Sequence, residues 1–125
     1  MKKFLIFIIL IIGAYFLFKK TKTTTLPPPV SNPDIVVYWG DGCPHCENVK
    51  KYVNDNNVAS KIKIDYREVW NDPKNKEQML SDVKNCPEIN VSQGIGVPLA
   101  FVPADKKCLG GDVPIIDWLK SKMLQ

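Results

Sequence analysis

The feature that most constrains this chain of 125 residues is a pair of cysteines, Cys43 and Cys46, separated only by Pro44 and His45. A short apolar run, Ile35 to Trp39, precedes the pair, and apolar residues recur at helical spacing after it. Two cysteines at this spacing are typical of a redox centre or a metal site, and they can also be two buried thiols. The position of the pair between a predicted strand and a predicted helix helps to choose among these three possibilities.

Helix geometry gives this spacing a chemical meaning. Cys43, at the start of the helix, meets unpaired backbone N–H groups and the positive end of the helix dipole, which both favour a thiolate. Cys46 lies on the same face, three residues further on, and can reach Cys43. Pro44 suits the first turn, where its missing N–H has no partner to lose. The pattern therefore predicts an activated thiolate beside its own resolving thiol, as thiol–disulfide exchange requires.

The rest of the sequence alternates between strand and helix patterns. Four stretches are expected to be strands: Ile35–Trp39, Lys61–Asp65, Leu99–Val102 and Lys106–Leu109. Helices are expected after Cys43, after Asp72 and from Asp112, with Asp72 and Asp112 as caps. Leu80 and Val83 should form the apolar face of the second helix. The predicted order is β-α-β-α-β-β-α.

This order, with Cys43-Pro44-His45-Cys46 opening the first helix and Val97-Pro98 preceding the final hairpin, resembles the thioredoxin superfamily. The resemblance covers about Asp34 to Gln125, which is nearly the whole chain after its N-terminal segment. A Cys-x-x-Cys motif alone is a weak signal, but its combination with a preceding strand and a later X-Pro is much more specific. The resemblance implies an α/β, thioredoxin-like fold.

The resemblance also implies roles for individual residues. Cys43 would be the nucleophile, Cys46 would resolve the mixed disulfide, and Pro98 would be cis and would face the pair. Val97 and Trp39 are the expected substrate-binding residues, Val97 because it precedes this proline and Trp39 because it ends the first strand near the active turn. Pro44 and His45 complete the expected catalytic motif.

Two branches of the superfamily share features with this chain. The Pro-His dipeptide is that of the DsbA-type oxidases, in which His45 would donate to the Cys43 thiolate or sit charged beside it. The segment 72–96 has room for one helix and a loop, as in glutaredoxins, and 110–112 resembles the Gly-Gly-Asp turn that helps them hold glutathione. Asp41 and Gly42 stand where glutaredoxins usually have a lysine. Protein thiols and disulfides are therefore the expected partners, with glutathione as a less favoured alternative, and no cofactor is expected.

Two further cysteines, Cys86 and Cys108, lack the Cys-x-x-Cys spacing. In an exported domain they are expected to form a second disulfide, which would contribute about 3 kcal/mol to a small core. The alternative is two separate buried thiols that pack as small apolar side chains. The sequence leaves both open.

A metal-binding or metal-delivery module is the alternative function. Cys43 and Cys46, together with His45 or Cys86, are the ligands that such a site would use. The chain has one histidine, and Glu47 after Cys46 rules out the Cys-x-x-Cys-His pattern of haem attachment. An enzyme that carries out thiol–disulfide exchange, reset by a redox partner, is therefore the predicted function, and no metal site is expected.

The N-terminal segment is predicted to be a membrane anchor. Phe4 to Phe18 contains no charge and is flanked by five lysines. A 15-residue helix covers about 22 Å, which is short of the ~30 Å hydrocarbon core unless the flanking lysines extend to the interface. A cleaved secretory signal is the alternative, although small residues of the A-x-A kind are missing after the run. These lysines account for much of the formal charge of +4, so no nucleic-acid partner is inferred.

Three regions follow from this organisation: an anchor over 1–20, a threonine- and proline-rich stalk over 21–33 and the folded domain over 34–125. Three consecutive prolines in the stalk favour an extended polyproline II conformation, which would hold the domain away from the bilayer. A two-lysine N-terminal tail is most simply left in the cytoplasm. The catalytic domain is therefore expected to be extracytoplasmic.

Overall fold

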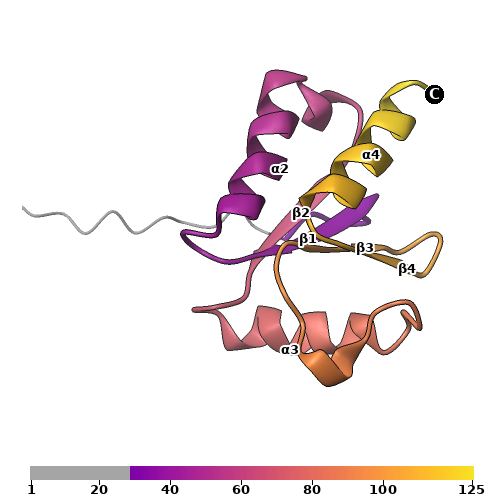
Figure 1. The fold of residues 1–125 in the computed structure, drawn as a ribbon. Helices are drawn as coiled ribbons and strands as arrows, with labels where there is room; N and C mark the ends of the chain where they lie inside the picture. Colours follow the sequence, from indigo (N-terminus) through magenta and orange to yellow (C-terminus); the bar gives the residue numbers. More distant parts are fainter. Residues whose placement is uncertain (1–28) are drawn as a thin grey trace, which may run out of the picture.

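The structure is a computed structural model that describes residues 29–125 (Figure 1). Its helices and strands follow in the order β1 (Ile35–Trp39), α2 (Pro44–Asp55), β2 (Ile64–Glu68), α3 (Pro73–Val83), β3 (Leu99–Val102), β4 (Lys107–Gly110) and α4 (Asp112–Met123). Two short 3-10 turns lie at Val58–Ser60 and Val91–Gln93. The predicted β-α-β-α-β-β-α order is present.

The four strands form one mixed sheet in the order β2-β1-β3-β4. β1 is parallel to β2, with Ile35 opposite Ile64, and antiparallel to β3, with Val37 opposite Ala100. β3 and β4 form an antiparallel hairpin. β1 therefore lies inside the sheet, and its C-terminal end leads directly into the Cys43 turn.

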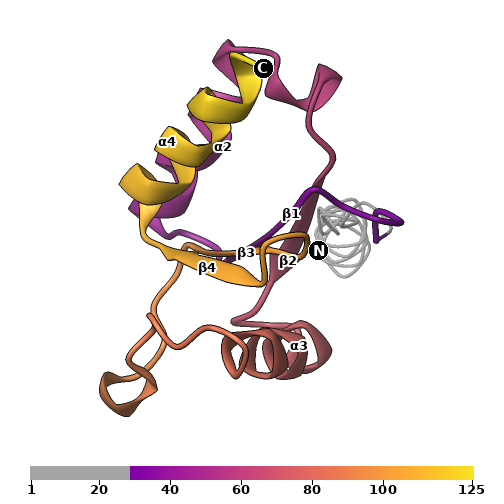
Figure 2. The same cartoon turned by 90° about the vertical axis from the view of Figure 1, so that its right-hand side faces the viewer.

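Helices cover both faces of the sheet. α2 and α4 lie together on one face and α3 lies on the other, in both views (Figures 1 and 2). Alternate residues of β1 serve the two faces: Ile35 and Val37 pack in the core under α2 and α4, while Val36 and Tyr38 pack in the core under α3. Burial on both faces explains why β1 reads as a continuous apolar run rather than an alternating one.

Three local predictions need correction. β2 begins at Ile64 rather than at Lys61, because the backbone N–H of Lys61 bonds the Val58 carbonyl at the end of a 3-10 turn. Val83 is buried as predicted, but Leu80 is 44% exposed and Met79, four residues before Val83 on the same helix face, is buried in its place.

The third correction concerns Asp112. It does not cap α4, which has Gly111 at its N-cap position and no side-chain cap. Asp72, by contrast, caps α3 as predicted, with its side chain accepting from the backbone N–H groups of Lys74 and Asn75.

The predicted anchor, 1–20, and most of the predicted stalk, 21–28, lie outside the described residues. Within residues 29–125, no helix has the length and apolar character needed to span a bilayer.

Candidate active site

The candidate active site lies at the turn between the end of β1 and the start of α2. Cys43 occupies the N-cap position of α2 in an extended conformation, and Pro44 takes the first helical position. The backbone N–H of Cys46 points at the Cys43 sulfur, with 3.3 Å between nitrogen and Sγ. Cys43 and Cys46 form a disulfide in this structure. After reduction, the same N–H and the helix dipole would stabilise a thiolate on Cys43.

The loop before β3 faces Cys43 from the other side. The Cys43 Sγ lies 3.6 Å from the carbonyl oxygen of Val97, and the Val97–Pro98 peptide bond is cis, as expected. Cys43 is 5% exposed and Cys46 is 1% exposed. A second sulfur that arrives from solvent therefore meets Cys43 before Cys46, next to the partly buried Val97.

His45 contacts the neighbouring helix α4 rather than the cysteines. Its Nδ1 lies 3.2 Å from Oδ1 of Asp112, and Asn48 donates from Nδ2 to Oδ2 of the same carboxylate across 2.6 Å. These bonds, first that from Asn48 and then that from His45, hold the pKa of Asp112 below its usual value. The Asp112 carboxylate thus joins the start of α4 to the first turns of α2. His45 itself is largely exposed, at 68% of its side chain.

Trp39, predicted to bind substrate, is partly covered. The Nζ of Lys50 lies 3.5 Å from the centre of its ring, and its indole Nε1 is buried with no hydrogen-bond partner among the described residues. The ring therefore offers little free surface to a substrate.

A second tryptophan, Trp70, is the exposed aromatic side chain beside the turn. It is 59% exposed, and its indole lies on Gly40, where a Cβ atom would overlap the ring. The loop that carries Trp70 is fixed by the buried carboxylate of Glu68, which accepts from the backbone N–H groups of Trp70 (2.9 Å) and Asn71 (2.8 Å). Gly40, Glu68 and Trp70 were not predicted from the sequence. Only an aromatic residue just after an alternating stretch hinted at them.

Cys86 and Cys108 form a second disulfide, which joins the segment after α3 to β4. Both are 2% exposed. Beside them, the Glu88 carboxylate accepts from the backbone N–H of Cys108 at 2.8 Å, and this bond lowers the pKa of Glu88. The disulfide is remote in sequence from the Cys43–Cys46 pair and anchors the loop that leads to Val97.

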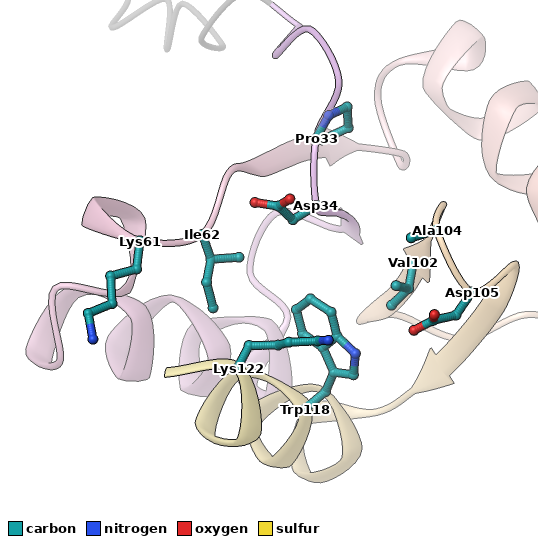
Figure 3. A pocket seen from close by; sticks show the side chains of 9 residues that line it. All are labelled: Pro33, Asp34, Lys61, Ile62, Val102, Ala104, Asp105, Trp118 and Lys122. Atoms are coloured by element: carbon teal, nitrogen blue, oxygen red, sulfur yellow. The ribbon is translucent and has the colours of Figure 1, made fainter. Parts of the chain in front are cut away.

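Other parts of the described chain offer no rival centre. Within residues 29–125, no three metal-ligating side chains come close enough together to hold a metal ion. A hollow of about 290 Å³ lies at the start of β1, between Asp34, Lys61 and the α4 residues Trp118 and Lys122 (Figure 3). Because Cys43 follows the opposite end of β1, this hollow is separate from the candidate active site.

Comparisons with known proteins bear on the family of this site. The sequence model of the glutaredoxin family matches residues 35–94, which include β1, the Cys43–Cys46 pair and α3. The chain therefore carries a thioredoxin-superfamily domain. Solved structures similar to it include oxidized glutaredoxin 2 from Chlamydomonas reinhardtii, at 22% sequence identity and a TM-score of 0.46, covering 74% of this chain and 76% of that one. No curated protein sequence matches the chain significantly.

In this thioredoxin-superfamily domain, the structure assembles most of the residues that the sequence analysis selected. Cys43, Cys46 and Val97 meet at one point, and Val97 is joined to Pro98 by the cis peptide bond. His45 lies at the same helix end but faces Asp112. The arrangement can stabilise a thiolate, present a second thiol to it and place one backbone carbonyl beside the reacting sulfur.

Proposed function

We propose that this chain is a membrane-tethered thiol–disulfide oxidoreductase that exchanges disulfides with protein cysteines through Cys43 and Cys46. The observation that carries the proposal is the position of the Cys43 sulfur. It caps α2, accepts the N–H of Cys46 at 3.3 Å and lies 3.6 Å from the Val97 carbonyl.

The exchange reaction uses these groups in two steps. In the reducing direction, the Cys43 thiolate attacks a client disulfide, forms a mixed disulfide and releases one client thiolate. The Cys46 thiol, after it loses its proton, attacks the Cys43 sulfur and releases the second client thiolate. The client gains two electrons, and the Cys43–Cys46 pair becomes the disulfide. In the oxidising direction, the same steps run in reverse.

Glutathione-dependent reduction is the second candidate, and the glutaredoxin-family match over residues 35–94 favours it. The matched segment ends before 110–112, the turn that resembles the glutathione-holding turn of that family. In this chain, both oxygens of Asp112 already accept bonds from Asn48 and His45 on α2. Glutathione would have to share this carboxylate with Asn48 and His45, so we favour protein cysteines as the partners.

The tether is the second part of the proposal. Its support is the uncharged run Phe4 to Phe18 with lysines on both sides, followed by a proline-rich stalk. Labelling of Cys43 with a membrane-impermeant maleimide in intact cells, after mild reduction, tests where the domain lies. Labelling before lysis would support an extracytoplasmic domain, and labelling only after lysis would contradict it.

An exchange assay tests the activity itself. The full chain in detergent is mixed with insulin and dithiothreitol, with and without glutathione, and the appearance of reduced insulin is measured. We expect catalysis without glutathione, and its complete loss in Cys43→Ser. Equilibration of the pair against redox buffers then gives its reduction potential. A value near that of thioredoxin, about −270 mV, would indicate a reductase, and one near that of DsbA, about −120 mV, an oxidase.

A further inference from the structure

One face of the domain beside the candidate active site carries an open apolar groove, here called the α3 groove. Two hollows make it up, of about 320 Å³ and about 970 Å³, and both border Lys76, Met79 and Ile95. The smaller one begins at Val97 and Trp70, and the larger one continues between α3 and the loop after it, past Leu80 and Val91. In Figure 2, this loop lies alongside α3 on the side of the sheet away from α2 and α4.

The groove exposes much of the apolar surface that the described domain presents to solvent. Five large apolar side chains are strongly exposed in residues 29–125, and three of them, Trp70 (59%), Leu80 (44%) and Val91 (58%), border the groove. Clustered exposed apolar side chains mark interaction surfaces, whereas scattered ones do not.

The Trp70 side chain, at the inner end of the groove, is held in place by its neighbours. The buried Glu68 carboxylate fixes the backbone of Trp70, and Gly40 leaves room for the indole to lie flat on the chain three residues before Cys43. Losing these hydrogen bonds would leave the Glu68 carboxylate buried and unpaired, which is costly in free energy. The charged bonds therefore hold the loop in place. An aromatic ring that is both fixed and exposed loses little entropy when a partner packs on it.

The inner end of the groove is bordered by a residue that contacts the reacting sulfur. Val97, which lines its inner hollow, presents the carbonyl that lies 3.6 Å from the Cys43 sulfur. When the cysteine of a client reaches Cys43, the residues that flank this cysteine therefore lie near the inner end of the groove.

Length determines which clients can use it. α3 has 11 residues, and at 1.5 Å per residue it runs for about 16 Å. An extended chain at about 3.3 Å per residue needs about five residues to follow it. Glutathione, with one residue on either side of its cysteine, is too short. The rim carries Lys76, Lys84 and one acid, Glu77, so an acidic side chain in the client is compatible with it.

We propose that the α3 groove binds an extended client segment, with apolar side chains and an acidic residue on one side of the reacting cysteine, and so selects polypeptides over small thiols. The inference rests on the proposed exchange at Cys43. Trp70, Leu80 and Val91 are the residues that provide this selectivity.

The test measures mixed-disulfide formation by the reduced Cys46→Ser chain. Synthetic peptides carry one cysteine, capped as a disulfide with 2-mercaptoethanol, and differ only in a Leu-Glu-Leu-Leu segment placed before the cysteine, after it or replaced by Gly-Ser. The Cys43 thiolate attacks the peptide sulfur, the capping thiolate leaves, and mass spectrometry follows the peptide–protein disulfide. We expect one apolar arrangement to react about tenfold faster than the Gly-Ser peptide, which corresponds to burial of about one apolar side chain.

Groove variants then locate the preference. Leu80→Ser, Val91→Ser and Trp70→Ala, each in the same background, should reduce the ratio of the apolar-peptide rate to the Gly-Ser rate several-fold. Val113→Ser removes a side chain that is 64% exposed near the site but outside the groove, so it should keep the preference. Equal rates for all three peptides, or a preference that survives in all three groove variants, would overturn the groove. Failure of every peptide to react would overturn the exchange function itself.

Discussion

Asp112, the first residue of α4, holds His45 of the Cys-Pro-His-Cys motif with 3.2 Å between Oδ1 and Nδ1. The same carboxylate accepts a bond from Asn48, one turn further along α2. The Asp112 carboxylate thus links α4 to the N-terminal end of α2, where the Cys43–Cys46 pair lies.

The first prediction concerns the acid stability that follows from this contact. The pKa of Asp112 is lowered from 3.8, first by the Asn48 bond and then by His45. A carboxyl whose pKa is lower in the folded chain stabilises the fold above its unfolded pKa, and this stabilisation is lost as pH falls through the folded pKa. Asp112→Asn should therefore be less stable than the wild type near pH 6, and the difference should shrink below about pH 4.

Urea unfolding across this pH range measures the effect. Asp117→Asn is the matched control, because this exposed carboxylate of the same helix pairs, among residues 29–125, with Lys120 alone. A stability difference for Asp112→Asn that stays constant from neutral to acid pH would contradict the assignment.

The second prediction concerns the Cys86–Cys108 disulfide. Because it closes a loop with a sequence separation of 22 residues, its reduction should lower the free energy of unfolding by about 3 kcal/mol. A Cys43→Ser/Cys46→Ser background isolates this pair, so that oxidised and reduced samples differ in one bond. If the two samples unfold at the same urea concentration, the pair contributes nothing to stability.

A third prediction follows from Tyr66, whose hydroxyl is buried and has no partner among the described residues. Tyr66→Phe removes this unpaired group, so stability near neutral pH should be unchanged or higher by up to about 1 kcal/mol. Burial also raises the pKa of Tyr66 to about 12 from 10.0. Between these two values the unfolded chain ionises while the folded one does not, so the wild type loses stability as pH rises.

The variant should lose less over that range, as thermal unfolding in alkaline buffers would show. Tyr38, whose pKa is also raised by burial, remains and keeps part of the alkaline effect. A variant that is clearly less stable than the wild type at neutral pH would show that the Tyr66 hydroxyl has a partner.

The sequence predicted the parts of this domain that depend on local rules. Asp72 followed by Pro73 marked the start of α3, and the spacing of Cys43 and Cys46 marked the start of α2. The exposed position of Leu80 was not predictable, because Met79, Leu80 and Val83 are all apolar and only the packed sheet determines which side faces inward.

Contacts between distant segments were the other limit. Asp112 was expected to cap α4 but is its first helical residue, and only the packing of α4 on α2 places His45 and Asn48 within its reach. The position of the Trp70 ring was likewise not predictable, because the ring packs on Gly40, thirty residues earlier in the chain. Residues that act through tertiary neighbours leave no periodic or spacing signal in the sequence.

Covalent trapping tests the central claim most directly. The full-length Cys46→Ser and Cys43→Ser chains are expressed in cells, free thiols are blocked with acid and alkylation, and disulfide-linked partners are identified by mass spectrometry. Cys46→Ser should accumulate mixed disulfides with other proteins, because the Cys43 sulfur at the N-cap of α2 attacks and no second thiol releases the product. Cys43→Ser should accumulate none. Equal trapping by both variants, or trapping by neither, would contradict exchange through Cys43.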